Sequence, residues 1–274
     1  MNIMPKRKFK QLLLPALLFA LAIPVAALQA QPNAQSGPGE VAAPQGVSAE
    51  ALAIINRMTT YLRGLPTFSI ESQSSRDEVL PFGFKMQNNE TGRLVFRKPD
   101  NLRVEVDGDI RNRMFYFNGS TLTMYSPDNA VYAKLAKPGT LKSLIDGMLD
   151  AGIEMPMIDV LYQIGEGSLT ADVINGGLVG ESRIDGVDCY HLAFRQATLD
   201  WQMWVEKGER PLPRRIVITD RYEFGNPQYQ TTLRWNVQPK ISNSDFEFTA
   251  PKGVTEIPFK SPVSNQDSAT TGGK

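Results

Sequence analysis

Residues 94–124, LVFRKPDNLRVEVDGDIRNRMFYFNGSTLTM, alternate apolar and polar side chains in short runs. One of these runs places Leu102, Val104 and Val106 on the same side of an extended chain. Turn-forming residues at 98–101, 107–109 and 118–120 separate the runs. This alternation with a period of two, interrupted by turns, predicts an antiparallel meander that packs one face on a core.

The same pattern extends along the chain on both sides of this stretch. An earlier run begins at Phe68 and Ile70, and later runs cover 178–184, 188–195, 200–206, 214–221 and 229–237. The pattern predicts about ten or eleven strands in total. An antiparallel sheet of that size usually curls, because strand twist accumulates from one strand to the next.

Two segments have the apolar spacing of helices instead. Residues 48–64 repeat apolar side chains every three or four positions, with Ser48 as the N-cap and Gly64 at the end. Residues 140–165 predict a helix that starts at Thr140 and a second short helix opened by Pro156. We therefore expect an α+β fold, in which an N-terminal helix and a mid-chain helical lid cover the concave side of the curled sheet.

The first thirty residues have the composition of a secretory signal. Four basic residues precede an apolar run at 12–28, and small residues follow it. This pattern predicts a signal peptide over residues 1–30, cleaved near Ala27 or Ala30 after export to a bacterial periplasm. The alternative is a permanent membrane anchor. Pro15 and Pro24 interrupt the apolar run, however, and no basic cluster follows it as a stop-transfer signal.

The remaining chain divides by composition. Residues 31–47 are small, polar and rich in Pro and Gly, which predicts a flexible linker. Residues 48–260 contain the strand and helix patterns and predict a single folded domain. Residues 261–274 resemble the linker in composition and predict a disordered tail.

Charge and cysteine content exclude several classes of protein. After residue 30 the chain has 25 basic and 29 acidic side chains, so it lacks the basic excess of a nucleic-acid-binding protein. Cys189 is the only cysteine and His191 the only histidine. An internal disulfide and a Cys/His zinc site are therefore excluded, and we expect neither a metal nor a cofactor.

His191 is the obvious candidate for a catalytic role, with Cys189 two residues away. Side chains at i and i+2 of a strand are too far apart for a tight nucleophile–base pair without a bulge, so a structural histidine is favoured. Residues 175–180, NGGLVG, resemble a phosphate-binding loop but open a predicted strand, where such a loop would open a helix. We expect no catalytic residue.

Several segments resemble a bacterial family of predicted periplasmic proteins of unknown function. The resemblance covers roughly residues 50–258. It rests on DGDIRNRMFYFNG at 107–119, TLTMY at 121–125, GVDCYHLAFRQ at 186–196, DWQMWVE at 200–206 and RPLPRR at 210–215.

That family in turn is similar to the LolA/LolB/LppX superfamily of lipoprotein and lipid carriers. The similarity rests on FEFTAPKGV at 246–254, on the tryptophan-containing strand followed by Leu212 and Pro213, and on the order of elements. It implies an incomplete barrel with a helical lid, enclosing an apolar cavity for acyl chains. It implies no catalytic residues.

The leading hypothesis is a periplasmic, non-catalytic carrier for a lipid, a lipoprotein acyl chain or another apolar molecule, with transient membrane contact. The alternatives are an RseB-like envelope regulatory module that binds a protein partner through Trp204, and an enzyme. Ordinary core packing is the competing interpretation of each apolar residue. The predicted ligand-binding residues are Leu102, Val104, Phe117, Met124, Leu144, Ile145, Met148, Leu192, Phe194, Trp201, Met203, Ile216, Ile218, Leu233 and Trp235.

Overall fold

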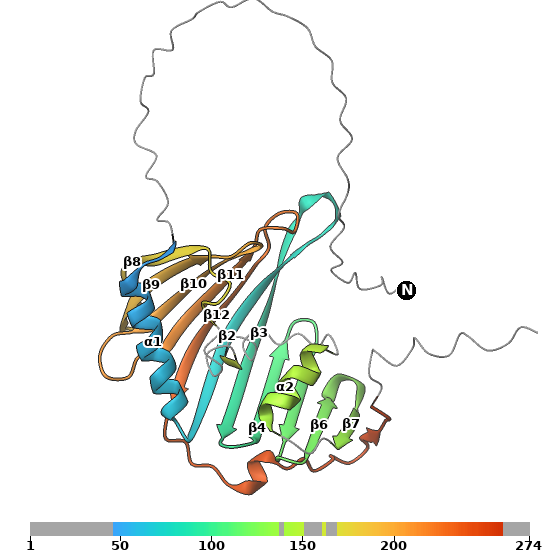
Figure 1. Ribbon diagram of the computed structural model, residues 1–274. Helices are drawn as coiled ribbons and strands as arrows, with labels where there is room; N and C mark the ends of the chain where they lie inside the picture. Colours follow the sequence, from blue (N-terminus) through green and yellow to red (C-terminus); the bar gives the residue numbers. More distant parts are fainter. Residues whose placement is uncertain (1–45, 137–139, 151–160, 163–168, 260–274) are drawn as a thin grey trace, which may run out of the picture. The chain divides into compact units, whose positions relative to one another are not determined.

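The computed structural model describes residues 46–136, 140–150, 161–162 and 169–259 of the chain (Figure 1). The predicted signal peptide, the predicted tail and all but the end of the predicted linker lie outside the described residues. The helices are α1 (Ala49–Gly64) and α2 (Leu141–Asp150), with short 3-10 turns η1 (Pro81–Gly83), η2 (Pro127–Asn129) and η3 (Asn243–Phe246). The strands are β1 (Gly46–Val47), β2 (Thr67–Val79), β3 (Lys85–Arg97), β4 (Asn101–Gly108), β5 (Arg113–Phe117), β6 (Thr121–Ser126), β7 (Val131–Ala136), β8 (Asn175–Ile184), β9 (Val187–Arg195), β10 (Leu199–Glu206), β11 (Pro213–Asp220), β12 (Gln228–Asn236) and β13 (Thr255–Glu256).

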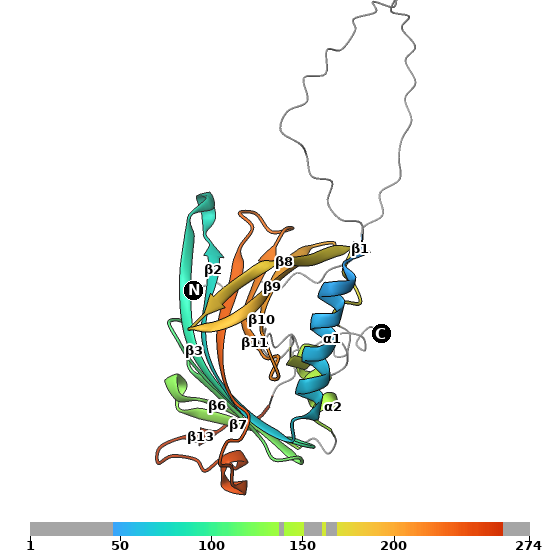
Figure 2. The ribbon, with the colours of Figure 1, turned by 90° about the vertical axis from the view of Figure 1, so that its left-hand side faces the viewer.

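In the described residues, all 13 strands form one sheet, in the order β1-β8-β9-β10-β11-β12-β2-β3-β4-β5-β6-β7-β13. The two outermost strands, β1 and β13, do not pair with each other, so the sheet is curled but not closed. Figures 1 and 2 show both helices on the concave side of the curled sheet. The predicted curled sheet is confirmed, but it has 13 strands among the described residues, more than the ten or eleven predicted.

The prediction of a purely antiparallel sheet is wrong at the two edges. Strand β1 pairs with β8 in parallel, and β13 pairs with β7 in parallel. The pairs between these edges, from β8 to β7, are antiparallel. A two-residue strand has no detectable alternation, so sequence patterns overlook it. Strand β1 also occupies the last two residues of the predicted linker.

Two further differences concern the N-terminal half of the sheet. Strand β7 was not predicted. Strands β2 and β3 are 13 residues each, far longer than the apolar runs at Phe68 and Leu94 indicated. Their distal halves carry polar side chains on both faces, and such segments give no hydrophobic alternation to detect.

The N-terminal helix has the predicted signals. The Ser48 side chain accepts a hydrogen bond from the Ala51 N–H at 3.2 Å, which caps the helix start. Helix α1 ends at Gly64, as predicted. Its buried residues are Ala51, Ile54, Ile55, Met58, Thr59 and Leu62, which form the stripe that faces the sheet.

The mid-chain insertion contains α2, which starts as predicted, with the Ser143 N–H donating to Thr140 Oγ1 at 3.3 Å. Leu144 and Ile145 are buried in the core. The predicted end at Gly152 lies outside the described residues. Of the second predicted helix, opened by Pro156, the structure describes residues 161–162, which are helical, and Leu161 packs against the core. The Tyr162 hydroxyl donates to Asp146 Oδ1 at 2.8 Å and fixes this later part of the insertion to α2. No helix within the described residues is long and apolar enough to cross a membrane.

The C-terminal segment crosses the outer face of the sheet. Phe246, in η3, is buried beneath the guanidinium of Arg97, with the Arg97 Cζ 4.8 Å from the ring centroid. Phe248 contacts the rings of Tyr116, Tyr125 and Tyr132, with centroids 5.0–5.5 Å apart. These aromatic contacts hold the segment against β4–β7 and carry it to the edge where β13 pairs.

Candidate ligand-binding face

The helix-bearing face of the sheet is a nearly continuous apolar surface. One row of residues paired across neighbouring strands runs from Trp235 through Ile70, Leu94 and Val104 to Phe115. A second row, two residues further along each strand, runs from Phe68 through Phe96, Leu102 and Phe117 to Leu122 and Leu135. Side chains in such rows share one face because strand side chains alternate.

The structure gathers the residues that were expected to line a ligand cavity. Most of them are buried members of one hydrophobic cluster, and Met124, Ile218 and Trp235 pack against it while partly exposed. The side chain of Met148 lies outside the described residues. Ligand contact by these residues stays a prediction. The buried members are Leu102, Val104, Phe117, Leu144, Ile145, Leu192, Phe194, Trp201, Met203, Ile216 and Leu233.

The two tryptophans of this cluster are held differently. Trp201 is 6% exposed and stacks on Phe194 of the neighbouring strand, with ring centroids 4.1 Å apart. Trp235 is partly buried, and its indole N–H donates to the Pro213 carbonyl at 2.7 Å. Trp235 therefore has its polar atom satisfied, as buried indoles require.

A strip of polar side chains interrupts this apolar face. Ser72 and Ser74 of β2 occupy the two inward positions after Ile70, and both are buried. The Ser74 hydroxyl donates to Thr231 Oγ1 at 2.9 Å, and the Tyr229 hydroxyl donates to Ser74 Oγ at 3.2 Å. We did not predict these residues as site residues. Serines at two successive inward positions of a strand that begins apolar were the signal in the sequence.

Arg113 stands at the far end of this polar strip. It is the partner of Val106 in the register of β4 and β5, and it shares the inward side with Phe115 and Phe117. Its Nε is buried and has no hydrogen-bond partner among the described residues. Burial lowers the pKa of Arg113 below its ordinary value, Arg111 lowers it further, and the charge of Glu90 opposes the change.

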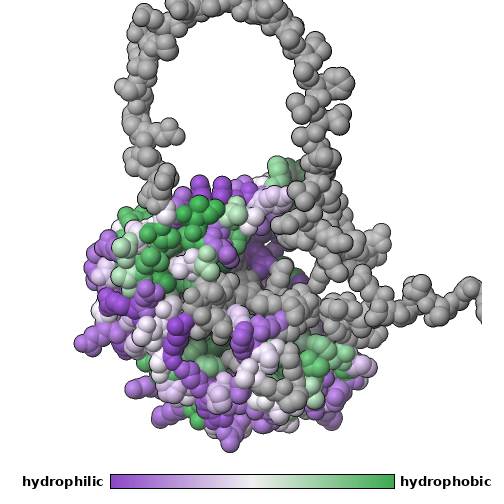
Figure 3. All heavy atoms as spheres, viewed as in Figure 1, coloured by the Kyte–Doolittle hydropathy of each residue, from purple (hydrophilic) through white to green (hydrophobic). Residues whose placement is uncertain are grey.

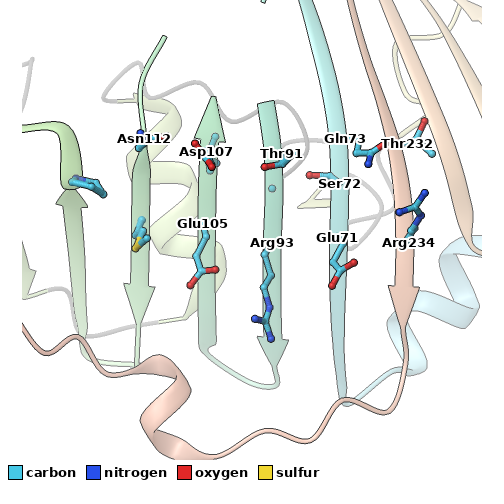
Figure 4. A pocket seen from close by; sticks show the side chains of 14 residues that line it. Glu71, Ser72, Gln73, Thr91, Arg93, Glu105, Asp107, Asn112, Thr232 and Arg234 are labelled. Carbon is cyan, nitrogen blue, oxygen red and sulfur yellow. The ribbon is translucent and has the colours of Figure 1, made fainter. Parts of the chain in front are cut away.

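The opposite face of the sheet carries a shallow polar groove of about 600 Å³. Figure 4 shows most of its side chains on five adjacent strands, β12, β2, β3, β4 and β5, viewed from the side away from the helices. Charges alternate across these strands through the paired residues Arg234, Glu71, Arg93 and Glu105. With Asp107, the groove lining has three acidic side chains and two arginines, so the groove carries one net negative charge and does not favour an anionic ligand.

The residues considered for catalysis lie on this outer face. His191 stacks on Trp204 with ring centroids 4.1 Å apart, and its Nε2 lies 2.9 Å from Gln202 Oε1. The Arg215 guanidinium covers Trp204, with its Cζ 5.4 Å from the ring centroid. Trp204, the predicted anchor for a protein partner, therefore already contacts His191 and Arg215. Its ring is not free to insert into a partner without leaving these contacts.

Cys189 is fully buried. Burial raises the pKa of its thiol to about 11. A thiol with so high a pKa is protonated at neutral pH and is a poor nucleophile. Among the described residues, no three His, Cys, Asp or Glu side chains are grouped so that they could hold a metal ion.

Comparisons with solved structures place the chain beside proteins of low sequence identity. It is similar to LprF from Mycobacterium bovis, with 14% identity over 73% of this chain and 98% of that chain and a TM-score of 0.46. The lipoprotein LppX from Mycobacterium tuberculosis has 15% identity over 71% and 100%, with a TM-score of 0.46. A LolA superfamily protein from Nitrosomonas europaea has 13% identity over 73% and 99%, with a TM-score of 0.33.

No curated protein matches the chain. A family model, in contrast, matches residues 51–260, which is nearly the whole part of the chain with strand and helix patterns. The family is described as "Predicted periplasmic protein (DUF2092)". The chain belongs to this family of periplasmic proteins, as its sequence resemblance indicated.

Proposed function

We propose that the protein is a non-catalytic periplasmic carrier that binds a lipid or acyl chain against the concave face of its sheet. The observation that carries the proposal is the gathering of apolar side chains from β4, β5, β9, β10, β11 and β12 into one cluster beneath two helices. The sheet around this cluster is not closed, since β1 and β13 do not pair. An open sheet edge leaves a route for a long apolar ligand to reach the cluster without unfolding the strands.

Helix α2 is the proposed lid. Leu144 and Ile145 cover the cluster, while Lys142 and Asp146 form an i,i+4 ion pair at 3.3 Å on the polar side of the helix. Among the described side chains of α2, these two buried apolar residues contribute about 3–6 kcal/mol of transfer free energy. An acyl chain that buries comparable apolar area can therefore replace these contacts and displace the helix.

Membrane contact is assigned to the tips of two hairpins. Phe82 and Phe84 at the β2–β3 tip, and Tyr222 and Phe224 at the β11–β12 turn, are exposed. The two tips lie side by side (Figure 1). A Cβ added to Gly83 at the first tip would lie 3.3 Å from the Phe224 ring at the second. Aromatic residues on protruding tips suit the interface of a lipid bilayer.

Phe82 adopts a left-handed backbone, with a φ of 77°, which is uncommon for an aromatic residue. The Phe82 ring at this turn is fully exposed. Outside the tips, hydrophobic residues on the helix-bearing side gather beside α1 and β8 (Figure 3), where Ile174 and Val179 are exposed. We assign membrane contact to the tips because they protrude from the sheet.

The test uses delipidated full-length mature protein and laurate as the ligand. Binding should stabilise the folded state and so raise the thermal midpoint. At a free laurate concentration a hundredfold above the dissociation constant, the stabilisation should be about 2.7 kcal/mol. Native mass spectrometry of protein purified from its own envelope should show a lipid-sized mass that denaturation removes. A thermal midpoint that does not respond to laurate or other single-chain amphiphiles would refute the carrier function.

A further inference from the structure

We propose that Arg113, at the end of the polar strip formed by Ser72, Ser74, Thr231 and Tyr229 on the concave face, binds the anionic headgroup of the carried amphiphile together with the nearer hydroxyls of that strip. The headgroup is an oxyanion, either a carboxylate or a phosphate, attached to an apolar chain. This inference rests on the proposed carrier function and specifies the ligand class for it.

The first argument is the unpaired state of Arg113. Three arginines, Arg103, Arg113 and Arg215, have a buried Nε without a hydrogen-bond partner among the described residues. Arg103 pairs through Nη2 with Glu105, and Arg215 donates through Nη2 to Gln230 at 2.7 Å. Arg113 forms no ion pair or hydrogen bond with any described residue. A partly buried guanidinium needs an acceptor, and a planar oxyanion matches its fork of donors.

The second argument is the surface next to Arg113. In the register of the sheet, Arg113 is followed by Val106, Gly92 and Ser72 on successive strands. A Cβ added at Gly92 would lie 2.4 Å from the Ser72 Oγ, so only glycine leaves room for that hydroxyl. The strip then continues from Ser72 to Ser74 on β2. Hydroxyl groups can donate to an oxyanion as well as to one another, so the linked hydroxyls can turn toward a bound headgroup.

The third argument is charge. Glu90, opposite Ser74 on β3, and Arg76, opposite Tyr229 on β2, act electrostatically on both Arg113 and Tyr229. Arg76 also covers the Tyr229 ring, with its Cζ 5.7 Å from the ring centroid. Arg111 is a further positive group that acts on Arg113, so Arg111, Arg113 and Arg76 outnumber Glu90 and the surroundings of Arg113 are net positive. An anionic headgroup reduces this excess of positive charge, whereas a neutral or cationic headgroup does not.

The fourth argument is the distance between polar and apolar regions. The row that contains Arg113 and Ser72 is adjacent to the row of Phe115, Val104 and Ile70, which is apolar and buried. Two residues along a strand span about 6.8 Å. The polarity therefore changes within the length of about five methylene groups, which suits a molecule with a charged head and an apolar tail.

The experiment compares ligands that differ only in the headgroup. Delipidated protein is titrated with laurate, with 1-dodecanol and with inorganic phosphate, and binding is followed by calorimetry and tryptophan emission. We expect laurate to bind about tenfold more tightly than 1-dodecanol, which corresponds to about 1.4 kcal/mol. Inorganic phosphate should not bind at concentrations where laurate saturates. Phosphate that binds as tightly as laurate would mean a site for a free anion and would overturn the proposal.

Variants identify the residue that binds the anionic headgroup. Arg113→Gln should remove the tenfold preference for laurate and leave 1-dodecanol binding unchanged, which also shows that the variant is folded. Arg93→Gln, on the opposite face of β3, is the matched control and should keep the preference. Glu90→Gln removes a negative charge from the strip and should tighten laurate binding severalfold without affecting 1-dodecanol.

Two outcomes separate this inference from the carrier function. If Arg113→Gln keeps the full preference for laurate, or Glu90→Gln leaves laurate binding unchanged, the headgroup lies elsewhere and the carrier function stands. If neither laurate nor 1-dodecanol binds to the unaltered protein, the carrier function fails and this inference fails with it. Should Arg113→Gln not fold, Arg113→Lys and Glu90→Gln provide the test, because lysine keeps the charge but not the planar fork.

Discussion

Phe194 and Trp201 stack across the β9–β10 pair with ring centroids 4.1 Å apart and planes inclined by 24°. They are opposite one another in the register, and Gly176 of β8 lies opposite Phe194 on its other side. A Cβ at Gly176 would meet Phe194 Cδ1 at 2.5 Å and the Ala193 carbonyl at 2.7 Å. The absence of a side chain at Gly176 thus leaves the space that the Phe194 ring occupies when it stacks on Trp201.

Gly176→Ala should destabilise the protein by about 1–3 kcal/mol, because the added methyl group forces the Phe194 ring and the strand backbone apart. Gly180→Ala in the same strand is the matched control, since a Cβ there meets nothing within 4 Å. It should change stability by less than about 0.5 kcal/mol. Urea unfolding followed by circular dichroism measures both. Equal midpoints for the two variants would contradict the packing described for Phe194.

Trp201→Phe should reduce the change in tryptophan emission that laurate causes, and Trp235, which packs against the same cluster, should account for what remains. Trp201 belongs to the apolar cluster, whereas Trp204 lies on the outer face between His191 and Arg215. Trp204→Phe should therefore keep the emission change. Phenylalanine retains a stacked ring next to Phe194, so thermal unfolding should show both variants folded. An emission change that disappears only in Trp204→Phe would place the ligand on the outer face.

Cys189 should not react with a thiol reagent in the native protein at pH 8, because the thiol is buried and the pKa is raised to about 11. Denaturant should make it fully reactive. The raised pKa also has a consequence for stability. The folded state holds the thiol proton more tightly than the unfolded state, so this contribution is present below the unfolded pKa, near 8.5, and is lost as the pH rises toward 11. The free energy of unfolding should therefore fall less between pH 8.5 and pH 11 in Cys189→Ala than in the unaltered protein. Urea unfolding at both pH values measures this difference.

Phe82→Ser combined with Phe84→Ser should reduce sedimentation with zwitterionic phosphatidylcholine vesicles by several fold. The two exposed rings would otherwise enter the bilayer interface, and serine offers no apolar area there. Ile257→Ser, which removes an exposed apolar side chain next to β13, is the matched control and should sediment like the unaltered protein. If the double variant sediments normally, the hairpin tips do not contact the membrane.

Local patterns were sufficient to identify most of the helices and strands and to assign the apolar face of each. Ser48 capped α1 as predicted, and the Asp185–Gly186 turn has both residues at positive φ, at 48° and 81°. The β2–β3 hairpin was harder, because its distal part has no apolar side to mark it. The candidate lining residues share a face because alternation along a strand is a local property of the backbone.

The sequence alone therefore determined that this chain forms a curled sheet with apolar inward positions, and that neither a disulfide nor a Cys/His metal site stabilises it. The tertiary structure decided which inward positions become neighbours. Ser74 and Thr231 are 157 residues apart in sequence, yet their hydroxyls lie 2.9 Å apart. Arg113 shares the concave face with these hydroxyls only because β12, β2, β3, β4 and β5 pair in one particular register. That register depends on hydrogen bonds between strands distant in sequence, and the periodicity of any single strand holds no information about them.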